Sequence, residues 1–387
     1  MRILFFAEFA NIDSTAPGFA VRCLAISRHL SDLGQTVTLV SPGVVTQSPT
    51  TDRFRYLSLG QSRQIPARRT GPASLLISDV RIVRAFAKLM RTYRGESVIV
   101  AAHDPLMAFL VLLAARIGFP VAVFDVHDSW LVLEKQHSGT WKNRVRKLFE
   151  RLAMQFATKI TTVTPTLGRM IADSYGIDDA KIRIIYNGSE KASESDAVEK
   201  DIDILHLGSP RPYYDTEAFV DALSIASGRG LSLSVVFLGC DNESYVSKVK
   251  QKVSLLKLSS QVTFVPPAPL AEVPTWLARA RTGLQTLSRD PAYRCAIAVK
   301  VFEYLAHGLP ILHLGPMDGE TAQLITAGQC GAAASDADGL AEILQRILPS
   351  SAELSRMSSK ARIVAREFSW DFSAREMARV LGESPES

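Results

Sequence analysis

Short apolar runs and longer amphipathic runs alternate along the chain. The first cycle consists of RILFFAEF, then VRCLAISRHLSDLG after the turn at Gly18, then QTVTLVSP. The short runs are typical of buried parallel strands, and the run between them has the apolar spacing of a helix. This order predicts a β-α-β unit in a parallel sheet covered by helices.

The same order continues through the chain and starts again after residue 200. Further strand candidates are SVIVAAHD, PVAVFDVHD and KITTVTP in the first half, and DIDILHLGS, LSLSVVFLGC, QVTFVPPAP, TGLQTLS and PILHLG in the second. Residues 191–200 (KASESDAVEK) hold few apolar groups, as linkers do. We therefore predict two doubly wound α/β domains at residues 1–190 and 201–365, joined by this linker. Residues 366–387 are predicted to form a helix that packs towards the first domain.

Composition narrows the class of protein. At 387 residues, with 47% hydrophobic residues, the chain is long enough for two cores. The four cysteines show no CxxC spacing, which favours a reducing compartment over a disulfide scaffold or a zinc site. The run at 107–115 (MAFLVLLAA) is too short to span a bilayer, and the N-terminus reads as a strand, not as a signal peptide. We expect a cytoplasmic protein, with peripheral contact at the inner face of the plasma membrane as an open alternative.

Polar residues interrupt one apolar helix in the second half, KVFEYLAHGLPIL at 300–312. The pattern predicts a helix from Ala296 to His307, ended by Gly308 with Pro310 beyond it. Lys300, Glu303 and His307 are spaced i, i+3 and i+7 and share one face of this helix. A surface ion pair between Lys300 and Glu303 would explain two of them, and a satisfied histidine at the helix end would explain the third.

Two predicted strands of the first half end in the same dipeptide, His103-Asp104 and His127-Asp128. Ligands of doubly wound sheets bind beyond the carboxyl ends of the strands, so both pairs are expected to face a cleft. For the first pair, which Pro105 follows, a helix N-cap is an equally simple explanation.

Several segments, in this order, resemble the GT-B glycosyltransferases of family 4. They are APGFAVRCLAISRHLSDLGQTVTLVSP, VFDVHD, IRIIYNG, VVFLG, VTFVPPAPLAEVPTWLARA and, most specifically, KVFEYLAHGLPIL. The resemblance implies a GT-B fold of two Rossmann-like domains facing a cleft. It implies transfer of a sugar from a nucleotide-diphosphate donor, with UDP or GDP expected, to a glycan, a lipid-linked saccharide or a small-molecule glycoside in polysaccharide or glycoconjugate biosynthesis. It implies no metal and no other cofactor, and the sequence itself offers no evident metal site.

The resemblance also assigns roles to residues. Glu303 would accept two hydrogen bonds from the ribose diol, and Lys300 would face the diphosphate together with the helix N-terminus near Ala296. His127 would lie near the anomeric carbon with Asp128 in support, and Asp13 is a further candidate if the reaction inverts. Other candidates for the donor site are Gly18, Gly208, Arg211, Asp290, Tyr293 and Arg294. An ordinary turn glycine and ordinary polar loop residues are the alternatives for Gly18 and for the loop at 290–294.

The chain departs from the family pattern at three positions. Ser209 and Tyr214 stand where an arginine and a lysine are usual, and we expect Arg211 to substitute for them. Cys295 stands eight residues before Glu303, where the family has a glutamate that contacts the donor sugar. Donor identity and stereochemical outcome are therefore left open. Two other functions also stay open: a nucleotide-sugar epimerase of the same fold, and a non-catalytic GT-B partner subunit.

Basic residues concentrate in the first half. Residues 1–198 hold 25 Lys and Arg against 17 Asp and Glu, while the whole chain holds 44 against 39. A solvated face explains such clusters, and an anionic membrane surface or a lipid-diphosphate acceptor is the alternative. Nucleic acid is not expected, because no recognised binding module accompanies the charge. The clusters are Arg63, Arg68 and Arg69; Arg81, Arg84, Lys88, Arg91 and Arg94; and Lys142, Arg144, Arg146 and Lys147.

Overall fold

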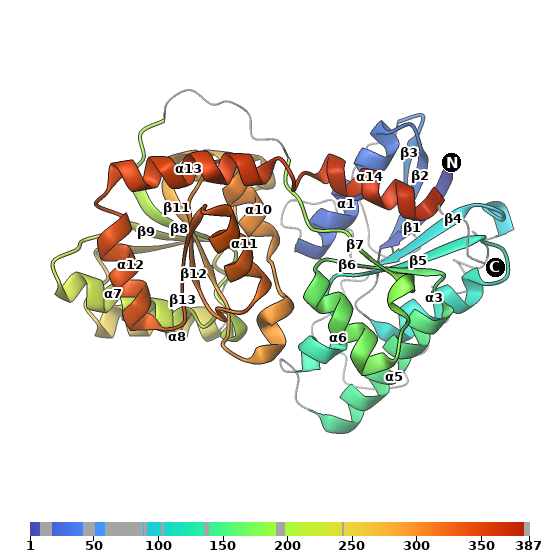
Figure 1. Ribbon diagram of the computed structural model, residues 1–387, viewed down its shortest axis with the longest axis horizontal. Coiled ribbons are helices and arrows are strands. Elements are labelled where there is room, and N and C mark those ends of the chain that lie inside the picture. Colours follow the sequence, from blue (N-terminus) through green and yellow to red (C-terminus); the bar gives the residue numbers. More distant parts are fainter. Residues whose placement is uncertain are drawn as a thin grey trace. The chain divides into compact units, whose positions relative to one another are not determined.

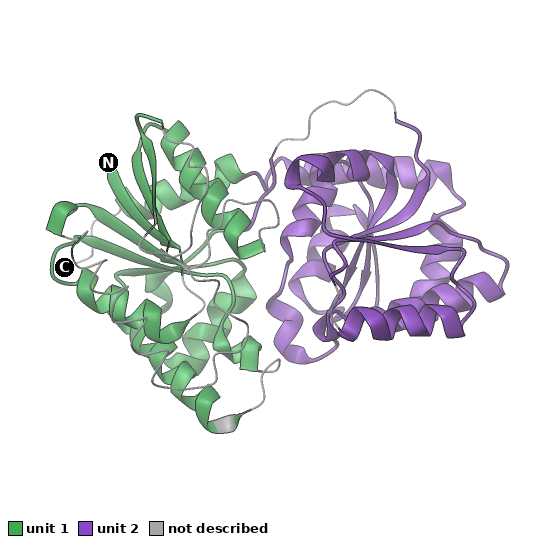
Figure 2. Cartoon of the chain, turned by 180° about the vertical axis from the view of Figure 1, so that it is seen from behind, with its two compact units in different colours: residues 1–186, 370–387 green, residues 187–369 purple. Residues whose placement is uncertain are grey.

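The chain forms two compact units, residues 1–186 with 370–387 and residues 187–369 (Figure 2). The computed structural model describes residues 1–7, 18–41, 51–58, 88, 91–101, 104–134, 139–190, 198–241 and 244–382. Asp13, His103, most of the predicted linker and the arginines at 63–84 lie outside the described residues.

Unit 1 is built on a seven-stranded sheet in the order β3-β2-β1-β4-β5-β6-β7. Neighbouring strands pair in parallel, and the order reverses between β1 and β4, where a doubly wound sheet binds its ligands. The strands are β1 (Arg2–Ala7), β2 (Thr36–Ser41), β3 (Phe54–Ser58), β4 (Ser97–Ala101), β5 (Val121–Val126), β6 (Lys159–Thr162) and β7 (Ile182–Ile184).

Helices flank this sheet, and the last helix of the described chain belongs to unit 1. In Figure 1, α14 (red) runs beside α1 (blue), so a late segment of the sequence packs against an early one. Trp370 and Met377 of α14 are fully buried, and the Ser373 hydroxyl donates to the Tyr186 carbonyl at 2.9 Å. The helices are α1 (Gly18–Asp32), α3 (Pro105–Ala115), α4 (Trp130–Leu133), α5 (Thr140–Phe156), α6 (Pro165–Tyr175) and α14 (Trp370–Gly382), with a 3₁₀ turn at Asp179–Lys181.

Unit 2 repeats the design with six strands in the order β10-β9-β8-β11-β12-β13. The pairs are again parallel, and the order reverses between β8 and β11. The strands are β8 (Ile202–Leu207), β9 (Val235–Leu238), β10 (Val262–Val265), β11 (Ala280–Thr286), β12 (Ile311–Leu314) and β13 (Gly331–Ala334).

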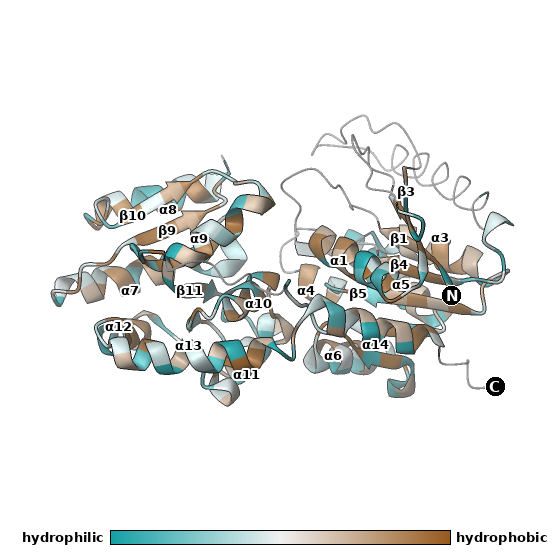
Figure 3. Cartoon of the chain, turned by 90° about the horizontal axis from the view of Figure 1, so that it is seen from above, coloured by the Kyte–Doolittle hydropathy of each residue, from teal (hydrophilic) through white to brown (hydrophobic). Residues whose placement is uncertain are grey.

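Seven described helices surround the second sheet. They are α7 (Thr216–Gly228), α8 (Ser244–Leu255), α9 (Val273–Arg279), α10 (Val299–Ala306), α11 (Glu320–Gly328), α12 (Ala337–Ile347) and α13 (Ser351–Ala365), with 3₁₀ turns at Pro212–Tyr214, Leu270–Glu272 and Pro291–Cys295. Figure 3 shows the expected pattern of burial, with strands such as β9 coloured hydrophobic and outer helices such as α13 banded in both colours.

The helix that carries Lys300 and Glu303 begins later than its pattern predicts. Ala296 and Ala298 have extended backbone, and α10 starts at Val299, so the prediction of a start at Ala296 was wrong. A 3₁₀ turn ends at Cys295, and the Thr321 hydroxyl then donates to the Ala296 carbonyl at 2.7 Å, which holds the extended stretch in place. Lys300 therefore lies in the first turn of α10.

Two aspartates cap helices in the described chain. Asp104 accepts hydrogen bonds from the backbone N–H groups of Leu106 and Met107, which confirms the N-cap explanation of the His103-Asp104 pair. Asp336 accepts from Gly339 N–H at the start of α12. In the part of the chain that the structure describes, no helix is long and apolar enough to cross a membrane.

Candidate functional site

Tyr304 fixes α10 against the second sheet. Its fully buried ring lies directly over Gly283 of β11, where a Cβ atom would come within 2.3 Å of it. Its hydroxyl accepts from Leu207 N–H at 2.8 Å and donates to the Leu284 carbonyl at 3.2 Å. These two bonds tie the helix to β8 and β11, the strands between which the sheet order reverses. The neighbouring polar residues of α10 are thereby held at the switch point of this unit.

Lys300 reaches the end of β8 from α10. Its Nζ lies 3.1 Å from His206 Nε2 and 4.2 Å from the centroid of the Tyr214 ring. Burial, and then the Lys300 charge, hold the pKa of His206 well below its usual range, so the neutral imidazole accepts from the ammonium. Burial lowers the pKa of Lys300 to about 7. No carboxylate pairs with Lys300 among the described residues, so the alternative explanation of Lys300 and Glu303 as a surface ion pair does not hold there.

Glu303 lies one turn further along the same helix and is half-buried. Burial, and then the neighbouring Glu190 carboxylate, raise the pKa of Glu303 to about 7. No lysine or arginine of the described ranges pairs with this carboxylate, so its oxygens keep their capacity to accept hydrogen bonds. His307 ends the helix with Nδ1 at 2.9 Å from the Glu303 carbonyl, as a satisfied helix-end histidine does.

The loop after β8 holds the proposed substitute arginine. Arg211 Nη2 lies 2.7 Å from Asp241 Oδ2, and the Ser209 hydroxyl donates to the other oxygen of Asp241 at 2.8 Å. The loop approaches the turn after β9 closely, because a Cβ on Gly239 would lie 3.1 Å from the Gly208 Cα. Gly208 itself has φ +91°, a conformation that favours glycine. Arg211 is therefore already paired within this loop.

The loop before α10 is held by its own contacts. Asp290 caps the turn by accepting from Ala292 N–H, and Arg294 pairs with Asp318 at 2.9 Å. Tyr293 is buried, with its ring stacked on Tyr213 at 6.2 Å between centroids. These residues shape the approach to α10.

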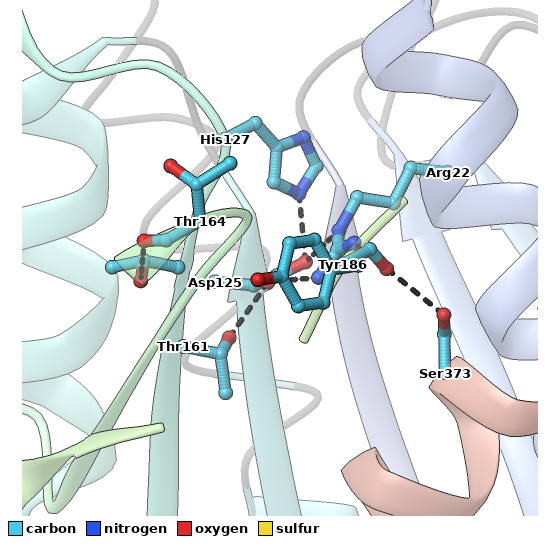
Figure 4. A network of polar contacts seen from close by, with 8 residues as sticks. Arg22, Asp125, His127, Thr161, Thr164, Tyr186 and Ser373 are labelled. Carbon is cyan, nitrogen blue, oxygen red and sulfur yellow. Dashed lines mark hydrogen bonds and ion pairs between the residues drawn. The ribbon is translucent and has the colours of Figure 1, made fainter. Parts of the chain in front are cut away.

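Unit 1 presents a second polar cluster, shown in Figure 4. His127 follows β5, and its Nε2 lies 2.7 Å from Asp125 Oδ2. The Phe19 ring, next to Gly18 at the start of α1, lies 4.5 Å from the imidazole. Asp128 is exposed, and Gly18 is the first residue of α1. His127 and the start of α1 therefore lie together, whereas Asp13 falls outside the described residues.

Arg22 and Asp125 belong to this cluster and were not predicted from the sequence. Arg22 is fully buried on α1 and forms two hydrogen bonds with the Asp125 carboxylate, at 3.1 and 2.9 Å. A signal was available, because each is a charged residue on an otherwise apolar face, in VRCLAI and in VAVFDV. Buried charges are rare unless paired, so the two could have been matched to each other.

No group of three or more possible metal ligands occurs among the residues with described positions, counting His, Cys, Asp and Glu. The described cysteines at 23, 240, 295 and 330 are buried thiols.

Solved structures share this architecture over almost the whole chain. Sucrose-phosphate synthase from Thermosynechococcus elongatus matches with a TM-score of 0.76, 16% identity and 98% coverage of both chains. HepE from Anabaena, in complex with UDP-glucose, matches with a TM-score of 0.73, 16% identity and 99% coverage of both. WaaG, a glycosyltransferase involved in lipopolysaccharide biosynthesis, matches with a TM-score of 0.70, 16% identity and coverage of 98% of this chain and 99% of WaaG.

Two parallel doubly wound units of this kind define the GT-B fold, and the chain has this fold. Its first unit carries the match to a family, because residues 17–191 fit the model described as Glycosyltransferase Family 4. The O-antigen chain mannosyltransferase RfbU of Salmonella typhimurium is 26% identical over 125 residues, which cover 31% of this chain and about a third (34%) of RfbU.

Proposed function

We propose that this protein transfers a sugar from a nucleoside diphosphate donor, with UDP or GDP as the nucleotide, to a glycan or lipid-linked saccharide. The observation that carries the proposal is the pair of ionisable groups on α10. Lys300 supplies a cation without a carboxylate partner among the described residues, and Glu303 supplies a carboxylate that no described cation faces. A nucleoside diphosphate offers both complementary groups, a diphosphate and a ribose diol.

Tyr214 gives a physical reason for the position of the cation. The family resemblance places a lysine at position 214, and here the aromatic ring at that position lies 4.2 Å from Lys300 Nζ. A ring face stabilises an ammonium group without neutralising it. Lys300 of α10 thus supplies, beside the loop after β8, the positive charge that the family pattern places on that loop. Arg211 is paired with Asp241, so it would contact the diphosphate only while it remains bonded to that carboxylate.

We propose that His127 contacts the sugar, with Asp128 beside it, and that the chemistry needs no metal. The described residues of unit 2 offer cations where the diphosphate would lie, and a cation can stabilise the leaving nucleotide. Polysaccharide or glycoconjugate biosynthesis is supported by the similarity to WaaG, which is involved in lipopolysaccharide biosynthesis, and to the O-antigen chain mannosyltransferase RfbU.

The test is calorimetric titration with UDP, GDP, ADP, CMP and TDP. One nucleotide should bind to the wild type, and Glu303→Gln and Lys300→Met should each weaken that binding by about tenfold or more, the worth of one charge-assisted contact. Lys248→Met is the matched control, because Lys248 is an exposed lysine of the same unit paired with Glu217. Binding of none of the five by a folded protein would favour the non-catalytic partner subunit.

The epimerase alternative is separated by product analysis. A transferase incubated with the nucleotide sugar and no acceptor should return its donor unchanged or slowly hydrolysed. Conversion into an epimeric nucleotide sugar without acceptor would contradict the proposal.

Helix α5 favours an acceptor held at a membrane surface. Trp141, Val145 and Leu148 follow one another at i, i+4 and i+7, and their exposed fractions are 63%, 41% and 53%. Arg144 and Arg151 are exposed on the same helix, and their spacing places both along one edge of this apolar stripe. An apolar stripe bordered by arginines along one edge fits the interface of an anionic bilayer. We propose peripheral contact with such a membrane through α5.

Only part of the predicted basic cluster on α5 is available for that contact. Arg146 stacks on the Trp130 ring at 4.3 Å, and Lys147 pairs with Glu134 at 2.8 Å. Lys142 is exposed. Of the second cluster, Lys88 and Arg91 are also exposed, and Arg81 and Arg84 lie outside the described residues.

A further inference from the structure

Arg22 is a fully buried arginine whose three nitrogens are all engaged. Its Nε and Nη2 donate to the two oxygens of Asp125, and its Nη1 donates to the Tyr186 carbonyl at 3.0 Å. Burying such a pair is a poor way to gain stability, because the cost of removing both charges from water offsets their attraction. The arrangement therefore calls for a reason other than stability.

Both oxygens of the Asp125 carboxylate accept hydrogen bonds. Besides Arg22, the Thr161 hydroxyl donates to Oδ1 at 2.7 Å, and His127 Nε2 lies 2.7 Å from Oδ2 (Figure 4). Burial raises the pKa of Asp125, but Arg22 and then His127 more than offset this, so its pKa lies well below the usual range. The carboxylate is ionised and can only accept. It follows that the hydrogen in the His127–Asp125 bond belongs to Nε2.

The other nitrogen of His127, Nδ1, has no partner among the residues that the structure describes. The side chain is 7% exposed, and Nδ1 is buried with no hydrogen bond among the described residues. The Phe19 ring lies against the imidazole, and the Asp125 bond restrains its rotation. With its hydrogen on Nε2, a neutral imidazole presents at Nδ1 a lone pair that accepts a hydrogen bond.

We propose that Asp125 is a positioning residue that fixes His127 in the tautomer with hydrogen on Nε2, so that Nδ1 accepts a hydrogen bond from a sugar hydroxyl. Arg22 and Thr161 hold the carboxylate in place for this task. The choice of a sugar hydroxyl as the donor to Nδ1 rests on the proposed function, whereas the tautomer and its cause do not.

Nitrogen NMR of the full chain labelled with ¹⁵N-histidine tests the proposal. His127→Gln identifies the His127 signals among the seven histidines. At pH 8 the wild type should show a ring hydrogen on Nε2 of His127 that exchanges slowly with water, and a bare Nδ1. A hydrogen found on Nδ1, or a rapidly exchanging one on Nε2, would overturn the proposal.

Two variants separate positioning from a merely structural role. In Asp125→Asn a single oxygen cannot serve donors on both sides, so the slowly exchanging Nε2 hydrogen should be lost or moved to Nδ1. Thr161→Val removes one donor but leaves the acceptor of His127, so it should keep the wild-type signal. Retention of that signal in folded Asp125→Asn would show that Asp125 does not fix the ring. If Asp125→Asn does not fold, the wild-type spectrum and Arg22→Lys, which keeps a cation beside Asp125, decide the matter, since both should show the slow Nε2 hydrogen.

Nucleotide binding on the same samples distinguishes the two hypotheses. UDP and GDP, titrated by calorimetry, report on unit 2, which contains neither Asp125 nor His127. Absence of binding with the expected tautomer would count against the proposed function alone, and normal binding with the wrong tautomer would count against this inference alone.

Discussion

Lys300 Nζ lies 3.1 Å from His206 Nε2. The ammonium group of α10 therefore contacts the neutral imidazole of β8, next to the point where the strand order of the second sheet reverses. The same amine lies over the Tyr214 ring. Neither neighbour neutralises the charge, and burial makes the charge costly, so with no carboxylate partner among the described residues Lys300 would gain a counter-charge from an arriving anion.

Nucleotide-sugar affinity should be greatest near pH 7. The pKa of Lys300 is lowered to about 7 and that of Glu303 is raised to about 7. Above pH 7 the amine loses the proton that attracts the diphosphate, and below pH 7 the carboxylate gains a proton and loses acceptor capacity. Affinity for UDP-glucose or GDP-mannose, whose diphosphates do not titrate near pH 7, should fall by up to about tenfold per pH unit on either side. Lys300→Met should abolish the fall above pH 7, as measured by calorimetry; an unchanged profile would contradict the assignment.

The free energy of unfolding should also depend on pH through the lowered pKa of Lys300. Its pKa is lowered from 10.5 in the unfolded chain to about 7 in the folded protein. Between these values the unfolded chain binds more protons, so the free energy of unfolding should rise with pH across this window. Lys300→Met should flatten this rise in urea titrations at pH 7 to 9. Lys248→Met, at an exposed position, should leave the slope as in the wild type.

Gly283→Ala should destabilise unit 2 by about 1–3 kcal/mol, the usual cost of overpacking a core. The added Cβ would lie 2.3 Å from the Tyr304 ring, whose hydroxyl is bonded to both neighbouring strands and has little room to move. Because α10 carries Lys300 and Glu303, nucleotide binding should weaken as well. Gly228→Ala is the control, since a Cβ there meets nothing within 4 Å and should change stability by less than about 1 kcal/mol. Equal effects of the two substitutions on urea unfolding would argue against the close packing.

Arg22→Met should cost about 3–5 kcal/mol in unit 1, because it leaves the buried Asp125 carboxylate without its cation. The exposed arginine of α14, Arg375, is the control: Arg375→Met should change stability by no more than about 0.5 kcal/mol. The double variant Arg22→Met with Asp125→Leu should recover much of the loss, because it replaces both charges by apolar groups. Failure to recover would mean that the size of the arginine matters more than its charge.

Membrane binding should depend on the apolar stripe of α5. The double variant Trp141→Ser with Leu148→Ser should lose about tenfold or more in affinity for vesicles with 30% phosphatidylglycerol, because it removes the two most exposed apolar groups of the stripe. Leu255→Ser, at an 82% exposed leucine of unit 2, is the control for a general loss of hydrophobicity. Sedimentation with neutral phosphatidylcholine vesicles should be weak throughout. Equal binding by the wild type and the double variant would rule out α5 as the contact.

Much of the fold could be predicted from local pattern, and the exceptions have local causes. Apolar runs such as VVFL in β9 and VAVF in β5 coincide with strands because both faces of a parallel sheet are covered. Strand β13, with the sequence GAAA, carries no β-branched residue and was not predicted. Its pairing depends on Gly331, where a Cβ would lie 2.0 Å from the Ile311 carbonyl oxygen. The start of α10 was placed three residues early for a related reason, since the contact that keeps Ala296 extended comes from Thr321.

The candidate site could be predicted only where one segment holds several of its groups. Lys300 and Glu303 share a helix face, so their spacing showed that they lie together. His206 and Tyr214 surround Lys300 from another strand and turn, and no spacing in the chain links them to it. Likewise Arg22 and Asp125 are separated by 103 residues, and only the sheet order brings α1 beside β5.

The return of α14 to unit 1 has a consequence for how the protein is made. Every residue of unit 2 precedes residue 370, whereas unit 1 lacks Trp370, Met377 and the Ser373 bond to Tyr186 until this last helix has been synthesised. On the ribosome the later-encoded unit is therefore the first whose sequence is complete. The face of α1 that α14 covers stays exposed on the nascent chain until α14 emerges, so chaperone contacts during translation should concentrate on that face.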